Sequence, residues 1–199
     1  MTLETKVLLI GGTSHAGKST LAAHLNDALG WEVRSTDQFA RHPGRPWRDD
    51  GSAVPRDVVA HFSSESNAGL LESVLWHYRE NVWPIAEAVV RSHLNNSFDP
   101  CLILEGSAIL PQAVGDSAFT RCRTVWLTAP DEWIRERILA SSRFSERSDT
   151  EKKLIDAFGD RALAFNQVIV DGASRLGERL VDVSSSDPLP ELIELARTG

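Results

Sequence analysis

Residues 12–19 read Gly12-Thr13-Ser14-His15-Ala16-Gly17-Lys18-Ser19, and they match the phosphate-binding pattern G-x-x-x-x-G-K-[ST] at every fixed position. A short apolar run at 7–10 precedes it, as in a buried parallel strand, and 19–29 follows with leucines at helical spacing. The motif is specific when it lies between a strand and a helix, as it does here. The sequence therefore predicts a loop that binds a nucleoside triphosphate.

Each residue type in this loop has a chemical role. Glycines let the backbone N–H groups curl around the phosphates, and the N-terminus of the helix adds a partial positive charge. Lys18 is predicted to reach the outer phosphates of ATP, and the Ser19 hydroxyl is predicted to ligate Mg²⁺. The residues expected to contact the nucleotide are Gly12, Thr13, Ser14, His15, Ala16, Gly17, Lys18, Ser19 and Thr20.

The composition favours a folded protein whose partners are neither nucleic acids nor membranes. The 199 residues suffice for one domain, and the net charge of −7 makes a polyanion an unexpected partner. No apolar run approaches the roughly 18 residues that a membrane-spanning helix needs, and Met1 leads directly into the first strand. Cys101 and Cys122 are predicted to be buried, reduced thiols. We expect a cytoplasmic protein, and a homodimer is left open.

Five short strand-like runs recur along the chain, at 6–10, 32–35, 101–104, 124–127 and 179–183. Helical patterns separate them, which predicts an α/β fold: a five-stranded parallel sheet with helices on both faces, in three α/β/α layers. Such sheets bind their ligands at the carboxyl ends of the strands. The residues at those ends are the phosphate loop, Asp37, Glu105, Pro130 and the serines at 184–186.

Two irregular segments interrupt this alternation. The segment 38–99 begins with a loop rich in proline, glycine and arginine and continues as predicted helices at 55–62, 68–78 and 82–94, the last interrupted near its start by Pro84. We expect it to be a substrate-binding helical insertion in a single domain that spans 1–199. The segment at about 141–150 lies between two helices and is predicted to be a lid.

These features resemble the small-molecule kinases of the P-loop superfamily, the group with adenylate, shikimate and gluconate kinases. Particular stretches are also similar to chloramphenicol phosphotransferases and 2-phosphoglycerate kinases. The resemblance rests on the phosphate loop, on Ser35-Thr36-Asp37 after the second strand, on Leu104-Glu105-Gly106 at the end of the third, and on the arginines of the segment 141–150. The order of elements covers nearly the whole chain, but the segment 38–99 does not identify the acceptor.

The resemblance implies catalytic roles for two carboxylates and two arginines. Asp37 would accept or orient the proton of the acceptor hydroxyl, and Glu105 would hold a water of the Mg²⁺ shell or orient the acceptor. The residues alone also allow Asp37 to be a helix N-cap and Glu105 a buried carboxylate satisfied by local N–H groups, so the identity of the base stays open. Arg143 and Arg147 would stabilise the transferring phosphoryl group, or lie on a solvated surface; Arg161 is less favoured.

A cationic patch opens the segment 38–99. Arg41, Arg45 and Arg48 lie close together, with His42 and Trp47, among prolines and glycines that stiffen the chain. We expect these residues to bind an acceptor that carries phosphate or carboxylate, or a planar ring stacked on Trp47. The alternative is a loop held by the acidic residues beyond it. The aromatic residues of 76–83 are predicted to form the core of the segment.

The sequence therefore predicts a Mg²⁺- and ATP-dependent phosphotransferase whose acceptor is a hydroxyl group of a small molecule. By analogy, adenine would lie near 184–190. The alternatives are a nucleotide-dependent switch or ATPase, and a kinase that acts on a nucleotide, an antibiotic or a nucleic-acid end. A GTPase is disfavoured because the chain contains no Asn-Lys pair, and a dinucleotide-binding oxidoreductase is excluded because the first loop lacks G-x-G-x-x-G.

Overall fold

A sheet of five parallel strands in the order β2-β3-β1-β4-β5 forms the centre of the protein. The computed structural model describes residues 5–50, 52–185 and 187–197. The strands are β1 (Val7–Gly12), β2 (Glu32–Ser35), β3 (Leu102–Glu105), β4 (Cys122–Thr128) and β5 (Leu180–Asp182). The predicted five-stranded parallel sheet is confirmed. The predicted boundaries differ by up to two residues, because polar and glycine residues continue the ladders beyond the apolar runs.

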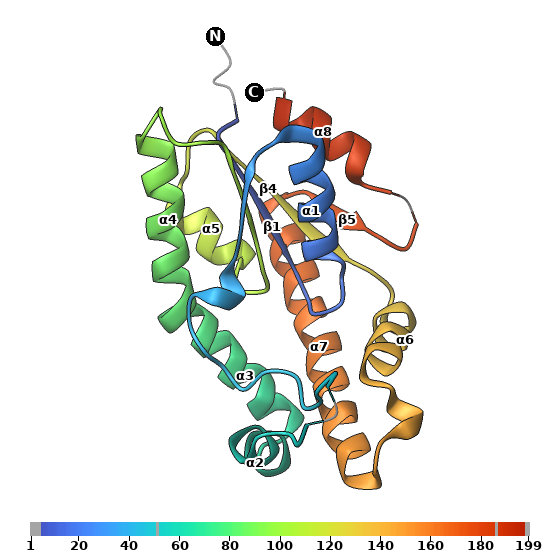
Figure 1. Ribbon diagram of the computed structural model, residues 1–199. Helices are drawn as coiled ribbons and strands as arrows, with labels where there is room; N and C mark the ends of the chain where they lie inside the picture. The colour runs from blue at the N-terminus through green and yellow to red at the C-terminus, as the bar shows by residue number, and fades with distance from the viewer. Residues whose placement is uncertain (1–4, 51, 186, 198–199) are drawn as a thin grey trace.

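Helices lie on both faces of the sheet and beyond its lower end (Figure 1). They are α1 (Lys18–Leu29), α2 (Arg56–Ser64), α3 (Asn67–His77), α4 (Trp83–Asn95), α5 (Pro111–Ser117), α6 (Asp131–Ser142), α7 (Asp149–Leu176) and α8 (Leu189–Arg197). Three short helical turns join them: η1 (Thr36–Gln38), the π-turn η2 (Tyr78–Val82) and η3 (Phe144–Glu146). No helix within the described residues is both long and apolar enough to span a bilayer.

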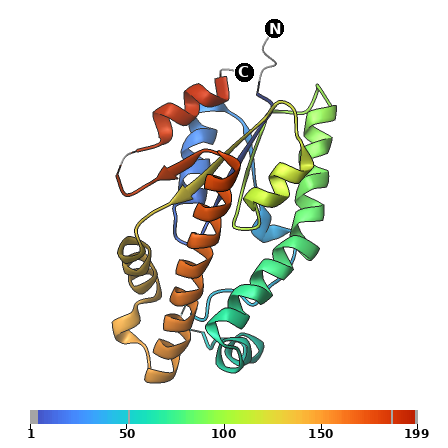
Figure 2. The same cartoon turned by 180° about the vertical axis from the view of Figure 1, so that it is seen from behind.

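Successive side chains of β1 pack into two different cores, one on each face of the sheet. Leu8 and Ile10 lie in the core formed with α1 and α8, whereas Val7 and Leu9 lie in the core formed with α4, α5 and α7. Figures 1 and 2 show these two helical layers from opposite sides. Because both faces are covered, all six residues of β1 are buried, which explains its continuous apolar run.

A third core lies beyond the carboxyl ends of the strands. It joins α2 and α6 to the first half of α7 around Trp47, Phe62 and Phe158. Helix α7 has 28 residues and is therefore ~42 Å long, enough to contribute to this core and to the sheet. A capping box between Ser148 and Glu151 fixes its start.

The predicted insertion is shorter than 38–99, because its last helix belongs to the sheet. Helix α4 packs Ala86 and Val90 against the core under β1 and β3, as an ordinary covering helix does. Pro84 does not interrupt it: Pro84 lies in the first turn, where its missing N–H costs nothing, and η2 joins α3 to α4 (Figure 2). The predicted aromatic core is confirmed for Trp83, which is buried, and is wrong for Trp76, which is 62% exposed.

The turns after β2 and β3 are packed unusually close together. Gly106 has φ +152°, and a Cβ on it would lie 1.8 Å from the Thr36 hydroxyl oxygen. Thr36 is buried in the first turn after β2, directly before Asp37. Glycine at this position therefore allows Asp37 and Glu105 to reach the same edge of the sheet. Both cysteines are free, as predicted, but they are half-buried rather than buried.

Replacing Gly106 tests this contact. We expect Gly106→Ala to lower the free energy of unfolding by about 2–4 kcal/mol, because the methyl group overpacks against Thr36 and the backbone is unfavourable for alanine. Urea denaturation measures the change. Gly115→Ala in α5 is the matched control: its nearest neighbour is the flexible Leu176 side chain at 3.4 Å, and alanine favours a helix. Equal stability of the two variants would contradict the tight contact.

Candidate active site

The loop between β1 and α1 is open toward the space in front of the helix. Gly17 is the N-cap of α1 with φ +84°, and no side chain caps the first turn. A Cβ at Gly17 would meet no atom within 4 Å, so this side of the loop faces open space. The first N–H groups of α1 are therefore free to bind an anion, as the phosphate-loop motif predicts.

Lys18 extends along the inside of the loop. Its ammonium group donates a hydrogen bond to the Thr13 carbonyl at 2.8 Å, and the Thr13 hydroxyl donates to the Ala162 carbonyl of α7 at 2.7 Å. Burial lowers the pKa of Lys18, while the charges of Glu105 and Asp37 oppose that shift. Lys18 is thus held in place with its charge partly desolvated, which strengthens its attraction to phosphate oxygens.

Ser19 and Glu105 form a polar pair at the foot of the loop. The Ser19 hydroxyl donates to a Glu105 carboxylate oxygen at 3.2 Å, and Glu105 is only 4% exposed. A hydroxyl and a carboxylate beside a triphosphate are the oxygen ligands that Mg²⁺ prefers, directly or through water. The donor set therefore fits Mg²⁺ bound together with nucleotide phosphates. No group of three or more His, Cys, Asp or Glu in the described part of the chain could hold a metal ion by itself.

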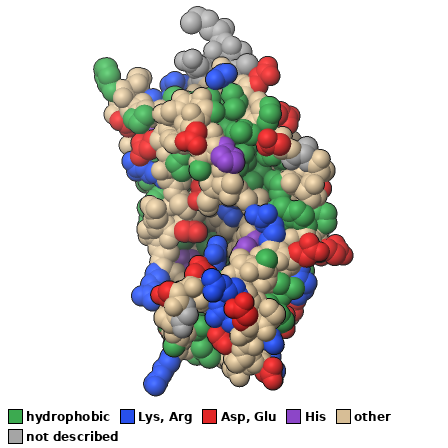
Figure 3. Space-filling model, turned by 45° about the vertical axis from the view of Figure 1, so that its right-hand side comes forward, with side chains coloured by type: hydrophobic (Ala, Val, Ile, Leu, Met, Phe, Trp, Pro, Cys, Tyr) green, Lys and Arg blue, Asp and Glu red, His purple; other side chains and the backbone are tan. Residues whose placement is uncertain are grey.

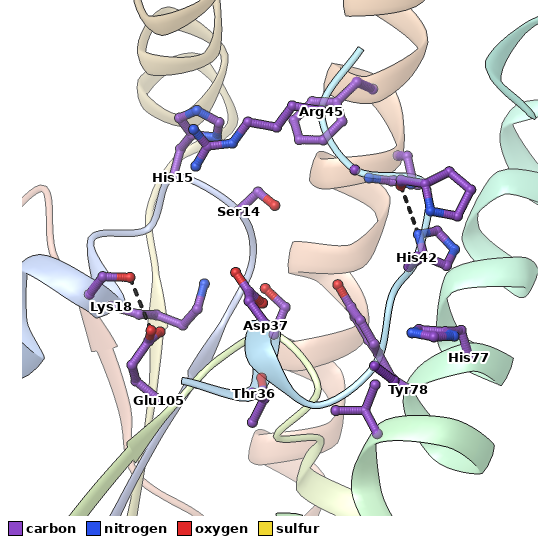
Figure 4. Close-up of a pocket in the computed structure, with 18 of the residues that line it drawn as sticks. Ser14, His15, Lys18, Thr36, Asp37, His42, Arg45, His77, Tyr78 and Glu105 are labelled. Atoms are coloured by element: carbon purple, nitrogen blue, oxygen red, sulfur yellow. Dashed lines mark hydrogen bonds between the residues drawn. The ribbon is translucent and has the colours of Figure 1, made fainter. Parts of the chain in front are cut away.

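A cleft of about 430 Å³ runs from the phosphate loop to α3 and α7. Figure 3 shows the hollow, with basic side chains gathered around it. Asp37 lies in the middle, between Lys18 and Glu105 on one side and Tyr78 on the other (Figure 4). Its side chain is not the N-cap that the sequence allowed: the Ser35 hydroxyl caps η1 by accepting from the Asp37 N–H at 3.3 Å.

The cationic patch of 41–48 divides between the cleft and the core. Arg45 lines the cleft, whereas Arg41 and Arg48 do not. Trp47 is only 2% exposed and packs edge-on against Phe158 at 5.0 Å. The expectation that Trp47 presents its ring to a ligand is therefore wrong in this structure, because the third core needs a large apolar side chain at that position.

Arg143 and Arg147 do not line the cleft either. Arg143 is exposed and ends α6 in a left-handed conformation. Arg147 donates to the carbonyls of Ser142 at 2.7 Å and Arg48 at 3.1 Å, so it ties the segment 141–150 to the loop before α2. In this conformation Arg147 stabilises local structure, and neither arginine reaches the cleft.

Two other arginines line the cleft instead. Arg137, on α6, donates to the His15 carbonyl at 3.2 Å and lies 4.5 Å above the Trp133 ring. Arg161, on α7, is buried beside Phe158. Arg161 is the less favoured arginine in the sequence, because a helical arginine without a motif carries no sign of which way it points.

His42 of the cationic patch also lines the cleft, and so do His77 and Tyr78, which sequence reasoning missed. His77 and Tyr78 fall in the aromatic stretch that was interpreted as core. They lie where α3 passes into the π-turn η2, a feature that often marks functional sites. No periodic pattern could have found them, because nearby residues of this helix point in different directions, some into the core and others into the cleft.

A second hollow adjoins the phosphate loop on the outer side of α1. It measures about 470 Å³ and is lined by Trp133, His24 and Pro188 among others. Gly17, Thr20 and Arg137 belong to both hollows. The predicted adenine region 184–190 contributes Ser184, Ser185, Asp187 and Pro188, while residue 186 lies outside the described residues.

Comparisons with known proteins identify the fold. No protein-family model matches the sequence, and no curated protein matches it. A gluconokinase from Sinorhizobium meliloti 1021 is similar in structure, with 17% identity, 99% of this chain and 91% of that chain covered, and a TM-score of 0.51. A shikimate kinase from Aquifex aeolicus has 15% identity, coverage of 95% and 92%, and a TM-score of 0.46. A sugar kinase from Janibacter sp. HTCC2649 has 18% identity, coverage of 96% and 92%, and a TM-score of 0.45.

The similarity to the gluconokinase extends over nearly all of both chains and shows a shared fold. The chain therefore shares its fold with this gluconokinase, and it has the three α/β/α layers that the sequence predicts. At 17% identity the similarity shows nothing about the substrate.

The placement of Arg137 predicts a role in nucleotide binding. We expect Arg137→Ala to weaken ATP binding about tenfold, because it removes a charge beside the phosphate loop and beside Trp133. Isothermal titration with a non-hydrolysable ATP analogue measures this. Arg143→Ala, at an exposed arginine six residues further on, serves as the control and should bind within about twofold of wild type. A larger loss of affinity for the ATP analogue in Arg143→Ala would indicate that the segment 141–150 contacts the phosphates.

Proposed function

We propose that the protein is a Mg²⁺-dependent phosphotransferase that transfers a phosphoryl group from ATP to a hydroxyl group of a small molecule. The observation that carries this proposal is Asp37, an exposed carboxylate that faces the phosphate loop across one cleft. An ATP-binding switch needs a phosphate loop and a metal ligand, but not a second carboxylate over a wide, polar cleft. A cleft that continues past Asp37 leaves room for an acceptor.

The nucleotide would lie across the two hollows that share Gly17 and Arg137. Its phosphates would meet the N–H groups at the start of α1 and the Lys18 ammonium, and its base would lie toward Trp133. Ser19 and Glu105 would hold Mg²⁺, directly or through water. Bound in this way, Mg·ATP supplies the phosphoryl group, and the metal neutralises charge that develops on it.

Asp37 is assigned as the group that takes the acceptor's proton. Glu105 already engages Ser19, which draws it toward the metal, whereas the Asp37 carboxylate has no hydrogen bond or ion pair with any described side chain. A free carboxylate can accept a hydroxyl proton as attack begins, and its position opposite the loop gives the attacking oxygen a direct line to the outer phosphate.

The acceptor would enter from the side of the segment 38–82. This segment contributes the loop 41–48, helices α2 and α3 and the turn η2, and it carries His42 and Arg45 on the cleft wall. The segment 141–150 lies next to this segment, tied to the loop 41–48 by Arg147. Closure of these two segments over the reactants would exclude water, which otherwise competes with the acceptor hydroxyl.

Release of ADP in the presence of pooled acceptors tests the proposal. With Mg·ATP and pools of sugars, polyols, hydroxy acids, nucleosides and antibiotics, we expect one pool to raise turnover at least tenfold over the basal rate, and Lys18→Ala to abolish that increase. Circular dichroism of Lys18→Ala shows whether the fold is kept. Tight ATP binding without stimulation by any pool would favour a nucleotide-dependent switch.

Two carboxamide variants separate the roles of the carboxylates. We expect Asp37→Asn to lower kcat about 10²–10⁴-fold with little change in KM for ATP, because the base is lost and nucleotide contacts are kept. Glu105→Gln should instead raise the Mg²⁺ concentration needed for half-maximal activity. Titrations of Mg²⁺ and ATP on both variants measure this, and the opposite pattern would make Glu105 the base.

A further inference from the structure

Arg161 is a buried cation, and the described residues offer it no counter-charge. It is 7% exposed, lines the cleft, and lies 5.0 Å from the Phe62 ring and 4.9 Å from the Phe158 ring. Within residues 5–50, 52–185 and 187–197, no acidic side chain forms an ion pair with it, and its Nη1 atom has no hydrogen-bond partner. Because an unpaired buried charge is costly, its retention here points to a ligand that supplies the opposite charge.

Further polar groups surround the same end of the cleft. Burial raises the pKa of Tyr78 to about 12, so its hydroxyl keeps its proton and can donate it in a hydrogen bond. His42 and His77 have ring centroids 4.8 Å apart, and both Nε2 atoms are buried without a partner. Figure 4 shows these three side chains on the far side of Asp37 from the phosphate loop.

Arg161 belongs electrostatically to this end of the cleft. Its charge acts on His42 and on Tyr78. The charges that act on Lys18 are instead those of the two site carboxylates and Arg45. Arg161 lies beside Phe62 of α2, and it shares a small hollow with Tyr78 and with Ser14 of the phosphate loop. A ligand at Arg161 would therefore lie where the acceptor is expected, between the segment 38–82 and the phosphate loop.

We propose that Arg161, Tyr78 and His42 bind a carboxylate or phosphate group of the acceptor, whose hydroxyl group then lies at Asp37. This rests on the proposed function and names its substrate class: an anionic hydroxy compound. The anion gives Arg161 its counter-charge and accepts a hydrogen bond from Tyr78. Two anchored ends fix the acceptor's orientation, which places one hydroxyl in line with the phosphate loop.

His42 makes this binding depend on pH. Its Nδ1 donates to the Pro43 carbonyl at 2.8 Å, so the neutral ring presents a lone pair at Nε2, and contact with an anion there requires a second proton. The titratable and charged groups that face its ring are Arg161 of α7, His61 of α2, and His77 and Tyr78 of α3 and η2. Burial and then the charge of Arg161 lower the pKa of His42 to about 4. A bound anion raises it, so the acceptor binds with uptake of a proton and binds more tightly as pH falls.

Matched acceptor pairs test the anionic site. Comparing D-gluconate with D-glucitol tests for recognition of a carboxylate, and comparing D-glucose 6-phosphate with D-glucose tests for recognition of a phosphate. Each compound is assayed with Mg·ATP. In the wild type we expect the charged member of one pair to exceed its neutral partner about 100-fold in kcat/KM, and the responding pair identifies the anion. In Arg161→Met that ratio should fall about 30-fold, with KM for ATP changed less than about twofold.

Two controls keep this result interpretable. Arg175→Met changes an exposed arginine on the same helix and should leave the ratio unchanged. The melting temperature of Arg161→Met should equal or exceed that of the wild type, since a buried unpaired cation is replaced by an apolar side chain of similar length. A marked fall in melting temperature together with an unchanged ratio would make Arg161 a structural residue and overturn the inference.

A binding measurement separates this inference from the kinase proposal. With Mg·ADP saturating the phosphate loop, a millimolar concentration of the charged compound should raise the melting temperature of the wild type and not that of Arg161→Met. A shift without any turnover would support the anionic site and count against the kinase proposal. Turnover of the neutral members alone would support the kinase proposal and overturn the anionic site. The absence of both turnover and a shift in melting temperature would also overturn the anionic site.

A pH profile tests the part assigned to His42. Between about pH 8 and pH 5, KM for the charged compound should fall as pH falls, by at most about tenfold per pH unit, and the profile of His42→Gln should be flatter. Comparison of the two proteins cancels any titration of the compound itself. Parallel profiles would remove His42 from the site.

Discussion

The parallel pairing of β1 with β3, and of β3 with β2, is the constraint on which the candidate site depends. Parallel strands end at one edge of a sheet, so the loop after β1, Glu105 at the end of β3 and Asp37 just after β2 converge there. The contact of Gly106 with Thr36 brings the last two of these turns together. Because strands rather than long loops hold the residues, their spacing is built into the sheet.

Helix α7 joins the two ends of the cleft. Its Ala162 carbonyl accepts the hydrogen bond of Thr13 in the phosphate loop, and the preceding residue, Arg161, faces the proposed acceptor end. The cleft lining contains the basic side chains of Lys18, Arg45, Arg137 and Arg161 against the two carboxylates of Asp37 and Glu105. A protein of net charge −7 therefore has a cleft with a basic excess, which suits two anionic reactants that approach each other.

Much of the fold could be predicted because its signals are local. The apolar runs of buried strands, the helical spacing after Lys18 and the glycines of the loop each depend on a few neighbouring residues. The prediction was wrong where the structure depends on packing between distant segments. The sequence of α4 was predicted to be the last helix of an insertion, yet the apolar face of α4 covers β1 and β3. Pro84 was interpreted as an interruption because sequence does not show that a helix begins there.

Local sequence patterns specify the phosphate loop, the sheet and the carboxylates at the strand ends, since parallel strands carry those residues to one edge. Tertiary packing decides which arginines face the cleft. Arg137 and Arg161 line it, while Arg147 ties two loops together, although all three lie in polar or helical sequence of similar appearance. Trp47 entered the third core and Tyr78 entered the cleft for the same reason. The direction in which a side chain points depends on how segments far apart in the chain pack, and a local pattern does not contain that information.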